Sequence, residues 1–296
     1  MVTLAHISDV HLGPLPPVRP ADLMNKRLTG YLNWQLNRRA HMHTDTLSNL
    51  VSHMKAQNPD LTAVTGDLVN LALDAEFARA GEWIQTIGPP QNVCAIAGNH
   101  DVYVQGALAK FQQAMGRYAS GDLIDKQPYP YVRRLERVAL ICCNSAVATS
   151  PFNAYGVFDA EQQERLIRCL DLLDQAKFFR VVMIHHPPNV EYSEDKRRGL
   201  RGAELMREAI AEKGAELVLH GHIHRSTMHA MDGPKGEVPV IGVAAGSADA
   251  ASGEDPARYN LFDISRSRSK WHCNMREFGY QRIGDEIVER LNMRIF

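Results

Sequence analysis

Side chains that bind metal ions recur directly after short apolar segments of this 296-residue chain. They supply carboxylate, imidazole and amide oxygen, with no thiolate among them. This donor set suits transition-metal ions such as manganese, iron, zinc or cobalt, and it suits calcium poorly. The candidate metal ligands are Asp9, His11, Asp67, Asn99, His185, His222 and His224.

The apolar segments before these residues have the length and composition of buried strands. They cover residues 2–7, 61–65, 93–97, 138–142, 181–184 and 217–219. Segments with the residue spacing of helices lie between several of these strands. The clearest helix follows Asp159, which has capping-box spacing to Gln162, and its apolar stripe is Leu166, Ile167, Leu170 and Leu173. Alternating strands and helices predict an α/β architecture.

The chain changes character after His224, where apolar segments 238–245, 259–264 and 271–278 follow one another with little helix between them. We expect them to form a second, antiparallel-rich sheet that packs on the first. The predicted fold is a four-layer α-β-β-α sandwich of two mixed sheets flanked by helices. We expect a single domain over residues 1–296, with a cap insertion at about 14–42.

The positions of the candidate ligands suggest that they converge. Ligand sites of open α/β sheets collect at the carboxyl ends of the strands, and each candidate follows a predicted strand. In Asp9-x-His11 and His222-x-His224, an extended backbone would direct both members to the same side. Glycines at positions 66, 98 and 221 would allow tight turns and close backbone approach beside the ligands.

Together these blocks resemble the calcineurin-like metallophosphoesterase family, whose motifs are Asp-x-His, Gly-Asp, Gly-Asn-His-Asp, His and Gly-His-x-His in this order. The resemblance spans Asp9 to His224. It implies that Asp67 bridges two metal ions and that His100 faces the substrate. It also assigns Asp9, His11 and His224 to one ion, and Asn99, His185 and His222 to the other.

Two such ions, divalent or of mixed valence, can share a hydroxide formed near neutral pH, because metal coordination lowers the pKa of water. This hydroxide would attack phosphorus in line. His100, as an imidazolium, would stabilise the developing charge or protonate the leaving oxygen. Asp101 either orients His100 or a ligand, or caps the segment that follows it.

The block His185-His186-Pro187-Pro188 and the segment 219–224 resemble class III cyclic-nucleotide and glycerophosphodiester phosphodiesterases. The resemblance favours hydrolysis of a small phosphodiester. The alternatives are a phosphomonoesterase, a pyrophosphohydrolase of a nucleotide-linked lipid, and a scaffold without catalysis. A net charge of −1 offers no extended track for nucleic acid, so we expect no stable nucleic-acid partner.

The segment 26–42 places Leu28, Tyr31, Leu32 and Leu36 on one helical face and carries the basic residues Lys26, Arg27, Arg38 and Arg39. One interpretation is a cap helix that packs against the rim of the active site. The other is a peripheral helix that touches anionic lipid or a lipid substrate.

Four further residues are candidates for substrate contact. His186 and His220 adjoin predicted ligands, and their alternative role is to hold the loops in place. Arg197 and Arg201 belong to a basic cluster that either binds substrate phosphate or forms a solvated face.

The five cysteines lack any CxxC pair and mostly lie in apolar segments, as expected for reduced core residues of a cytoplasmic protein. The N-terminus lacks the basic region of a secretory signal, and no apolar run approaches the length of a membrane span.

Overall fold

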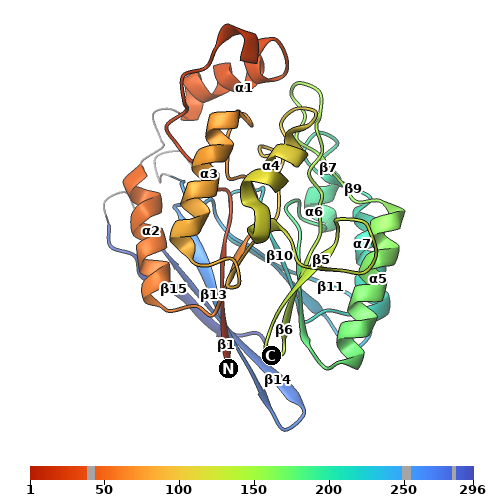
Figure 1. The fold of residues 1–296 in the computed structure, drawn as a ribbon. Helices are drawn as coiled ribbons and strands as arrows, with labels where there is room; N and C mark the ends of the chain where they lie inside the picture. Colours follow the sequence, from red (N-terminus) through yellow and green to blue (C-terminus); the bar gives the residue numbers. More distant parts are fainter. Residues whose placement is uncertain (39–43, 249–254, 282–284) are drawn as a thin grey trace.

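The computed structural model describes residues 1–38, 44–248, 255–281 and 285–296, and it contains two large mixed sheets (Figure 1). The six-stranded sheet has the order β15-β14-β13-β1-β2-β3. Its parallel strands are β1 (Val2–Ile7), β2 (Leu61–Val64) and β3 (Val93–Ala95). Its antiparallel strands are β13 (Arg258–Ser267), β14 (Lys270–Gly279) and β15 (Val288–Arg294).

The seven-stranded sheet has the order β11-β12-β10-β8-β6-β5-β4. Its parallel centre consists of β6 (Val138–Cys142), β8 (Phe179–Met183), β10 (Leu217–His220) and β12 (Val238–Gly242). Antiparallel strands form its edges: β11 (Thr227–Met231), β5 (Tyr131–Leu135) and β4 (Asp122–Leu123). The short strands β7 (Gly156–Val157) and β9 (Leu200–Arg201) pair with each other.

Helices cover the outer faces of both sheets (Figure 1). The six-stranded sheet packs on α2 (Thr44–Ala56), α3 (Asp74–Ile87) and α4 (Ala107–Met115) through one apolar cluster. The seven-stranded sheet packs on α5 (Ala160–Gln175) and α7 (Ala203–Lys213) through another. A third cluster, which includes Leu4, Leu140 and Phe262, joins the two sheets. The predicted four-layer sandwich is therefore confirmed.

The strands after His224 do not form a sheet of their own, contrary to the sequence prediction. β13 pairs antiparallel with β1, with Leu4 opposite Phe262, and so extends the sheet of the N-terminal strands. β12 instead pairs with β10 in the other sheet. The apolar pattern of a segment indicates that it is a strand, but the partner depends on packing between segments distant in sequence, which the pattern does not contain.

Helix α5 begins where its sequence predicts. The backbone N–H of Gln162 donates to Asp159 Oδ1 over 2.8 Å, which satisfies one of the otherwise unpaired donors of the first turn. Leu166 and Leu170 are fully buried against the sheet. Capping and apolar spacing together fix both the start and the buried face of this helix.

The segment predicted as a cap contains a 3-10 turn (Pro20–Leu23), α1 (Arg27–Asn33) and a π-helical turn (Trp34–Arg38). The last part of the predicted range, residues 39–42, lies outside the described residues. The helix α1 stands at one end of the molecule (Figure 1). The remaining short helices are a 3-10 turn (Gly116–Ala119) and α6 (Val190–Ser193).

The five cysteines are free thiols and all are buried, as the sequence analysis expects of core residues. Across the part of the chain that the structure describes, no helix is both long enough and apolar enough to cross a bilayer.

Candidate metal centre

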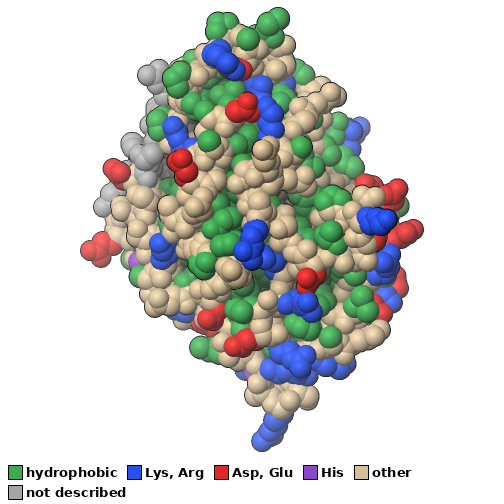
Figure 2. Space-filling model, in the orientation of Figure 1, with side chains coloured by type: hydrophobic (Ala, Val, Ile, Leu, Met, Phe, Trp, Pro, Cys, Tyr) green, Lys and Arg blue, Asp and Glu red, His purple; other side chains and the backbone are tan. Residues whose placement is uncertain are grey.

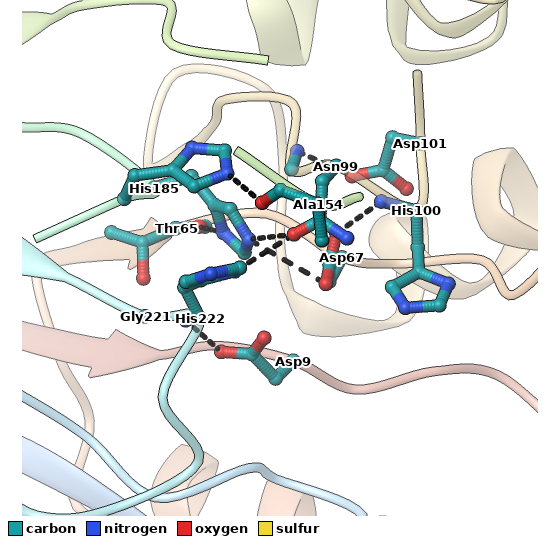
Figure 3. Close-up of polar contacts among 12 residues, drawn as sticks. Asp9, Thr65, Asp67, Asn99, His100, Asp101, Ala154, His185, Gly221 and His222 are labelled. Atoms are coloured by element: carbon teal, nitrogen blue, oxygen red, sulfur yellow. Dashed lines mark hydrogen bonds and ion pairs between the residues drawn. The ribbon is translucent and has the colours of Figure 1, made fainter. Parts of the chain in front are cut away.

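The seven predicted ligands come together at the carboxyl ends of five parallel strands, β1, β2 and β3 of one sheet and β8 and β10 of the other. Figure 3 shows Asp9, Asp67, Asn99, His185 and His222. These strands are almost entirely buried, and each is hydrogen-bonded within its sheet, which positions the loop that follows it. One group of ligand atoms comes from Asp9, His11, Asp67 and His224, all within 4.8 Å of one another. Asn99, His185 and His222 form a second group beside it.

Asp67 connects the two groups. Its Oδ2 lies 3.8 Å from His11 Nε2 in the first group and 3.5 Å from His185 Nε2 in the second. Its Oδ1 is engaged elsewhere, because it accepts a hydrogen bond of 2.7 Å from the backbone N–H of His100. A single carboxylate oxygen, Oδ2, therefore faces both groups, which would allow Asp67 to bridge two ions.

Backbone carbonyls set the tautomers of three histidines. A carbonyl can only accept, so His11 Nδ1 donates to Val69 O (3.2 Å) and His185 Nδ1 donates to Thr65 O (2.7 Å). His222 Nε2 donates to Arg198 O over 2.9 Å. The lone pairs consequently reside on His11 Nε2, His185 Nε2 and His222 Nδ1, the atoms that face the two groups.

When His185 and His222 are both neutral, the second group contains three acceptors directed at one another. Asn99 Oδ1 lies 3.2 Å from His185 Nε2 and 2.8 Å from His222 Nδ1. Without a proton on either nitrogen, these lone pairs repel unless a cation lies among them. The arrangement and the chemistry of the donors thus fit a transition-metal ion.

The first group also contains an acceptor atom without a hydrogen-bond donor within the described ranges. Asp9 Oδ1 is buried and accepts no hydrogen bond among the described residues, although a buried carboxylate oxygen normally has a partner. His224 Nε2 lies 3.3 Å from this oxygen and 3.3 Å from His11 Nε2. The residues of this group therefore fit a second cation, and Asp67 joins the two.

The electrostatics also favour bound cations. Burial opposes charge on His185, but the carboxylates of Asp67 and Asp9 outweigh burial and raise its pKa to about 9. Burial also opposes ionisation of Asp67, yet the surrounding histidines hold its pKa well below the usual range. Without a metal, the carboxylates attract a proton onto His185, and a cation would displace that proton.

Five of the seven candidate ligands have a left-handed backbone: Asp9 (φ 52°), His11 (37°), Asp67 (55°), His222 (72°) and His224 (54°). This finding corrects the extended geometry expected for Asp9-x-His11 and His222-x-His224. The members of each pair converge because the chain turns sharply after the strand. Such conformations are unfavourable for residues other than glycine, and they persist where the surrounding structure imposes them.

The predicted role of the neighbouring glycines is confirmed by the close approach of backbone segments. A Cβ at Gly66 would lie 2.6 Å from the backbone nitrogen of Gly98 and 2.8 Å from His185 Nδ1. A Cβ at Gly98 would collide with Asp67 Oδ1, and one at Gly221 would collide with Ser8. Any larger residue at these positions would push the ligand-bearing loops apart.

His100 lies beside the two groups, and its ring centroid is 4.8 Å from that of His11 (Figure 3). Its Nδ1 donates to the backbone oxygen of Asn70 over 2.7 Å, so the second proton of the imidazolium is on Nε2.

Asp101 has a different role from that of His100. It accepts hydrogen bonds from the backbone N–H groups of Gly98, Leu68 and Val69 (2.8–3.1 Å), and so ties two ligand-bearing loops together.

His186 and His220 are fully buried. His186 Nε2 donates to Ala154 O over 3.1 Å, and its Nδ1 accepts from Ser145 Oγ over 2.7 Å. Although His186 lies within reach of His185 and His222, both of its ring nitrogens are engaged, which favours the loop-holding role. His220 Nδ1 donates to Gly221 O over 3.0 Å, which favours the same role.

The two arginine candidates lie in different surroundings. Arg197 is exposed and lines the cleft above the ligands, together with Arg198. Arg201 is stacked on the ring of Tyr155, with its guanidinium 3.4 Å from the ring centroid, and it is not among the residues that line the cleft. The structure brings Arg197 to the site and leaves Arg201 outside it.

Two residues that surround His100, Asn70 and Tyr103, were not predicted from the sequence. Asn70 supplies the carbonyl that binds His100 Nδ1, and Tyr103 stacks on the imidazole ring. Nothing in the sequence marks a backbone carbonyl as a partner. The position of Tyr103, three residues after His100, is a weak signal that could have identified it.

Five of the seven candidate ligands line a cleft of about 1290 Å³, namely His11, Asp67, Asn99, His222 and His224. The cap segment contributes Lys26, Trp34 and Leu36 to the lining, and Tyr192 and Arg198 also line the cleft. The cleft is large enough for a small-molecule substrate with groups on both sides of a phosphorus atom.

Residues 2–226 match the calcineurin-like phosphoesterase family, a region that contains every one of the seven ligands. The chain belongs to this family. Membership in the calcineurin-like phosphoesterases supports a metal-dependent phosphoric ester hydrolase that uses a pair of ions, and the donor set described above agrees with such a pair.

Among curated proteins, the chain is 25% identical over 249 residues to a probable cyclic nucleotide phosphodiesterase of Synechococcus sp., covering 77% of this chain and 83% of the relative. Among solved structures, it is similar to a dimetal phosphatase from Danio rerio (TM-score 0.61, 12% identity, 98% of this chain and 99% of the other). It is also similar to a purple acid phosphatase from yellow lupin, Lupinus luteus (TM-score 0.60, 11% identity, 94% and 51%). These structural similarities concern the fold.

Proposed function

We propose that this chain is a phosphodiesterase that hydrolyses a small phosphodiester with the help of two metal ions. Asp9, His11 and His224 would hold one ion, Asn99, His185 and His222 the other, and Asp67 Oδ2 would be shared. When bound, such ions activate water and neutralise charge on the phosphoryl oxygens. The arrangement of lone pairs around Asn99 Oδ1 is the observation that carries the proposal of metal binding.

The chain itself contributes orientation and proton transfer. Asn70 O holds the His100 ring through Nδ1, so an imidazolium at this position carries its transferable proton on Nε2. His100 lines the cleft, where this proton could pass to the leaving oxygen of the substrate. Asp101 keeps the loops of Asp67 and Asn99 at a fixed separation, which preserves the geometry of both ligands.

Two observations favour a diester over a monoester. The curated relative that covers most of the chain is a probable cyclic nucleotide phosphodiesterase. The cleft is lined by side chains from separate segments, among them Trp34 and Tyr192, and both substituents of a diester need such space. A monoester has a single substituent and would use only part of the cleft.

The proposal is tested by hydrolysis of bis-p-nitrophenyl phosphate and p-nitrophenyl phosphate with added manganese. We expect turnover of the diester, and we expect Asp67→Ala to abolish it. Activity on the monoester alone would reject the diesterase assignment in favour of a phosphatase. No activity on either ester in protein shown to contain two ions would reject the enzymatic function.

A further inference from the structure

An apolar surface extends outward from the cleft along the cap segment. Leu28, Leu32 and Leu36 are four residues apart, so they form one stripe on the helical turns of residues 27–38. All three are exposed, by 47%, 52% and 80% of their surface. Figure 2 shows hydrophobic side chains gathered at the end of the molecule where α1 lies.

The opposite side of the same segment attaches it to the rest of the protein. Arg27 donates to the backbone oxygens of Leu71 (2.8 Å) and Ala72 (2.6 Å). Gly30 lies against Tyr103 and Leu71 so closely that a Cβ would be 2.8 Å from Tyr103 Cζ. Trp34 is buried. The cap is thus held by a face that excludes the three leucines, and their exposure follows from this packing.

A further exposed apolar side chain, that of Phe152, lines the cleft. Phe152 is 80% exposed and has a left-handed backbone (φ 65°), which is rare for a bulky residue. Lys26 ties its loop to the cap, because Lys26 Nζ donates to Thr149 Oγ1 (2.5 Å) and Asn153 O (2.7 Å). Phe152 and Leu36 both line the cleft that contains the metal ligands.

We infer that this surface binds the hydrocarbon tail of an amphiphilic phosphoester, whose phosphate lies over the metal ligands. The inference rests on the proposed function and specifies its substrate class. The stripe starts inside the cleft at Leu36 and continues through Leu32 to Leu28, over about 12 Å at 1.5 Å per residue. An apolar surface that is continuous with a polar reaction site fits a ligand with the same two parts.

Binding of a tail is preferred to contact with a bilayer because Leu36 and Phe152, two highly exposed large hydrophobic residues, line the cleft that a bound molecule would enter. A surface that only meets a membrane has no need to continue into the cleft. Burial of a hydrocarbon chain against these side chains would strengthen binding with each added methylene.

The test compares p-nitrophenyl methyl phosphate with p-nitrophenyl octyl phosphate, both below the concentration at which micelles form. Water supplies an oxygen to phosphorus, the bond from phosphorus to the nitrophenyl oxygen breaks, and nitrophenolate leaves with the electron pair. The alkyl group stays on the phosphate. Since the leaving group is the same, the ratio of kcat/KM for octyl over methyl measures recognition of the tail.

We expect a ratio of about tenfold or more for the native protein, because several methylenes lose contact with water. The double variant Leu36→Ser/Phe152→Ser should lower the ratio to about twofold, and Leu28→Ser/Leu32→Ser should lower it in part. The matched control is Leu172→Ser on α5, an equally exposed leucine (55%) away from the cleft, which should leave the ratio unchanged.

A ratio near one in the native protein would overturn the inference, as would a high ratio that both double variants retain. A further arm uses phosphatidylcholine vesicles without substrate. Sedimentation with vesicles that Leu28→Ser/Leu32→Ser abolishes, combined with a ratio near one, would make the surface a membrane contact and also reject the inference. Hydrolysis of bis-p-nitrophenyl phosphate in the same preparations shows whether the proposed function itself holds.

Discussion

The phenol ring of Tyr103 stacks on the imidazole of His100, with 5.4 Å between ring centroids and 18° between the planes. Lys26 Nζ lies 4.4 Å from the centroid of the Tyr103 ring. The cap segment therefore contacts an aromatic side chain that stacks on the proposed proton donor. Tyr103 is a positioning residue in this arrangement, because it fixes the plane of the imidazole while Asn70 fixes its tautomer.

Removal of this ring should impair turnover more than binding. We expect Tyr103→Ala to lower kcat for bis-p-nitrophenyl phosphate by about tenfold with a smaller change in KM, because a misplaced general acid slows the chemical step. Tyr103→Phe keeps the ring and should retain most of the activity. Equal losses in both variants would show that the hydroxyl, and not the stack, matters.

Loss of His100 should depend on the leaving group. With His100→Ala, we expect a drop of at least about a hundredfold for a diester with an alkyl leaving group, and a much smaller drop for nitrophenyl esters, which depart without a proton. Metal content should remain that of the native protein. Equal drops for both kinds of ester would instead assign His100 to stabilisation of charge.

Asp67→Asn should remove the shared ligand. We expect fewer than two manganese ions per chain by elemental analysis after gel filtration, and a fall in kcat of at least about a hundredfold. Asp232→Asn, which changes an exposed carboxylate, is the control and should keep both ions. An Asp67→Asn protein that retains two ions with native affinity would refute the bridging assignment.

Asp101→Asn should destabilise the protein through its loops. An amide nitrogen would replace one carboxylate oxygen and would face a backbone N–H, either that of Gly98 or those of Leu68 and Val69. We expect the free energy of unfolding to fall by about 2–3 kcal/mol, measured by urea denaturation. An unchanged value would mean that these backbone donors find other partners.

Lys26 should make stability depend on pH. Burial lowers its pKa from the usual 10.5 to about 8, so between these values the unfolded chain binds more protons at Lys26 than the folded chain does. Relative to Lys26→Met, the native free energy of unfolding should therefore rise as pH increases from 8 to 10.5. The gain should be about 1 kcal/mol after allowance for solvent, since this side chain is partly exposed. A constant difference between the two proteins across this range would contradict the shift.

Much of the candidate site could be predicted from the sequence, because ligands such as Asp67 and His185 directly follow buried apolar strands. The carboxyl ends of parallel strands lie at one edge of a sheet, so convergence within each sheet follows from geometry, whereas the meeting of the two sheet edges depends on how the sheets pack. The start of α5 could also be predicted from the sequence, because the capping residue Asp159 and its partner Gln162 are only three residues apart.

Other features depended on contacts between distant segments. The sequence contained no sign that β13 would pair with β1 across more than 250 positions. It also placed Leu28, Leu32 and Tyr31 on one face, yet the cap packs through Arg27, Gly30 and Trp34 and leaves the leucines exposed. Periodicity identified an apolar stripe but could not state whether protein or another molecule covers it.

The left-handed conformation of Asp9, His11, Asp67, His222 and His224 has a consequence for protein engineering. Transplanting these side chains onto regular strands or helices of a different scaffold would reproduce the composition of the site without its shape. A successful graft would have to carry the strand ends and the tight loops as well, so the transferable unit is a stretch of main chain and not a set of residue types.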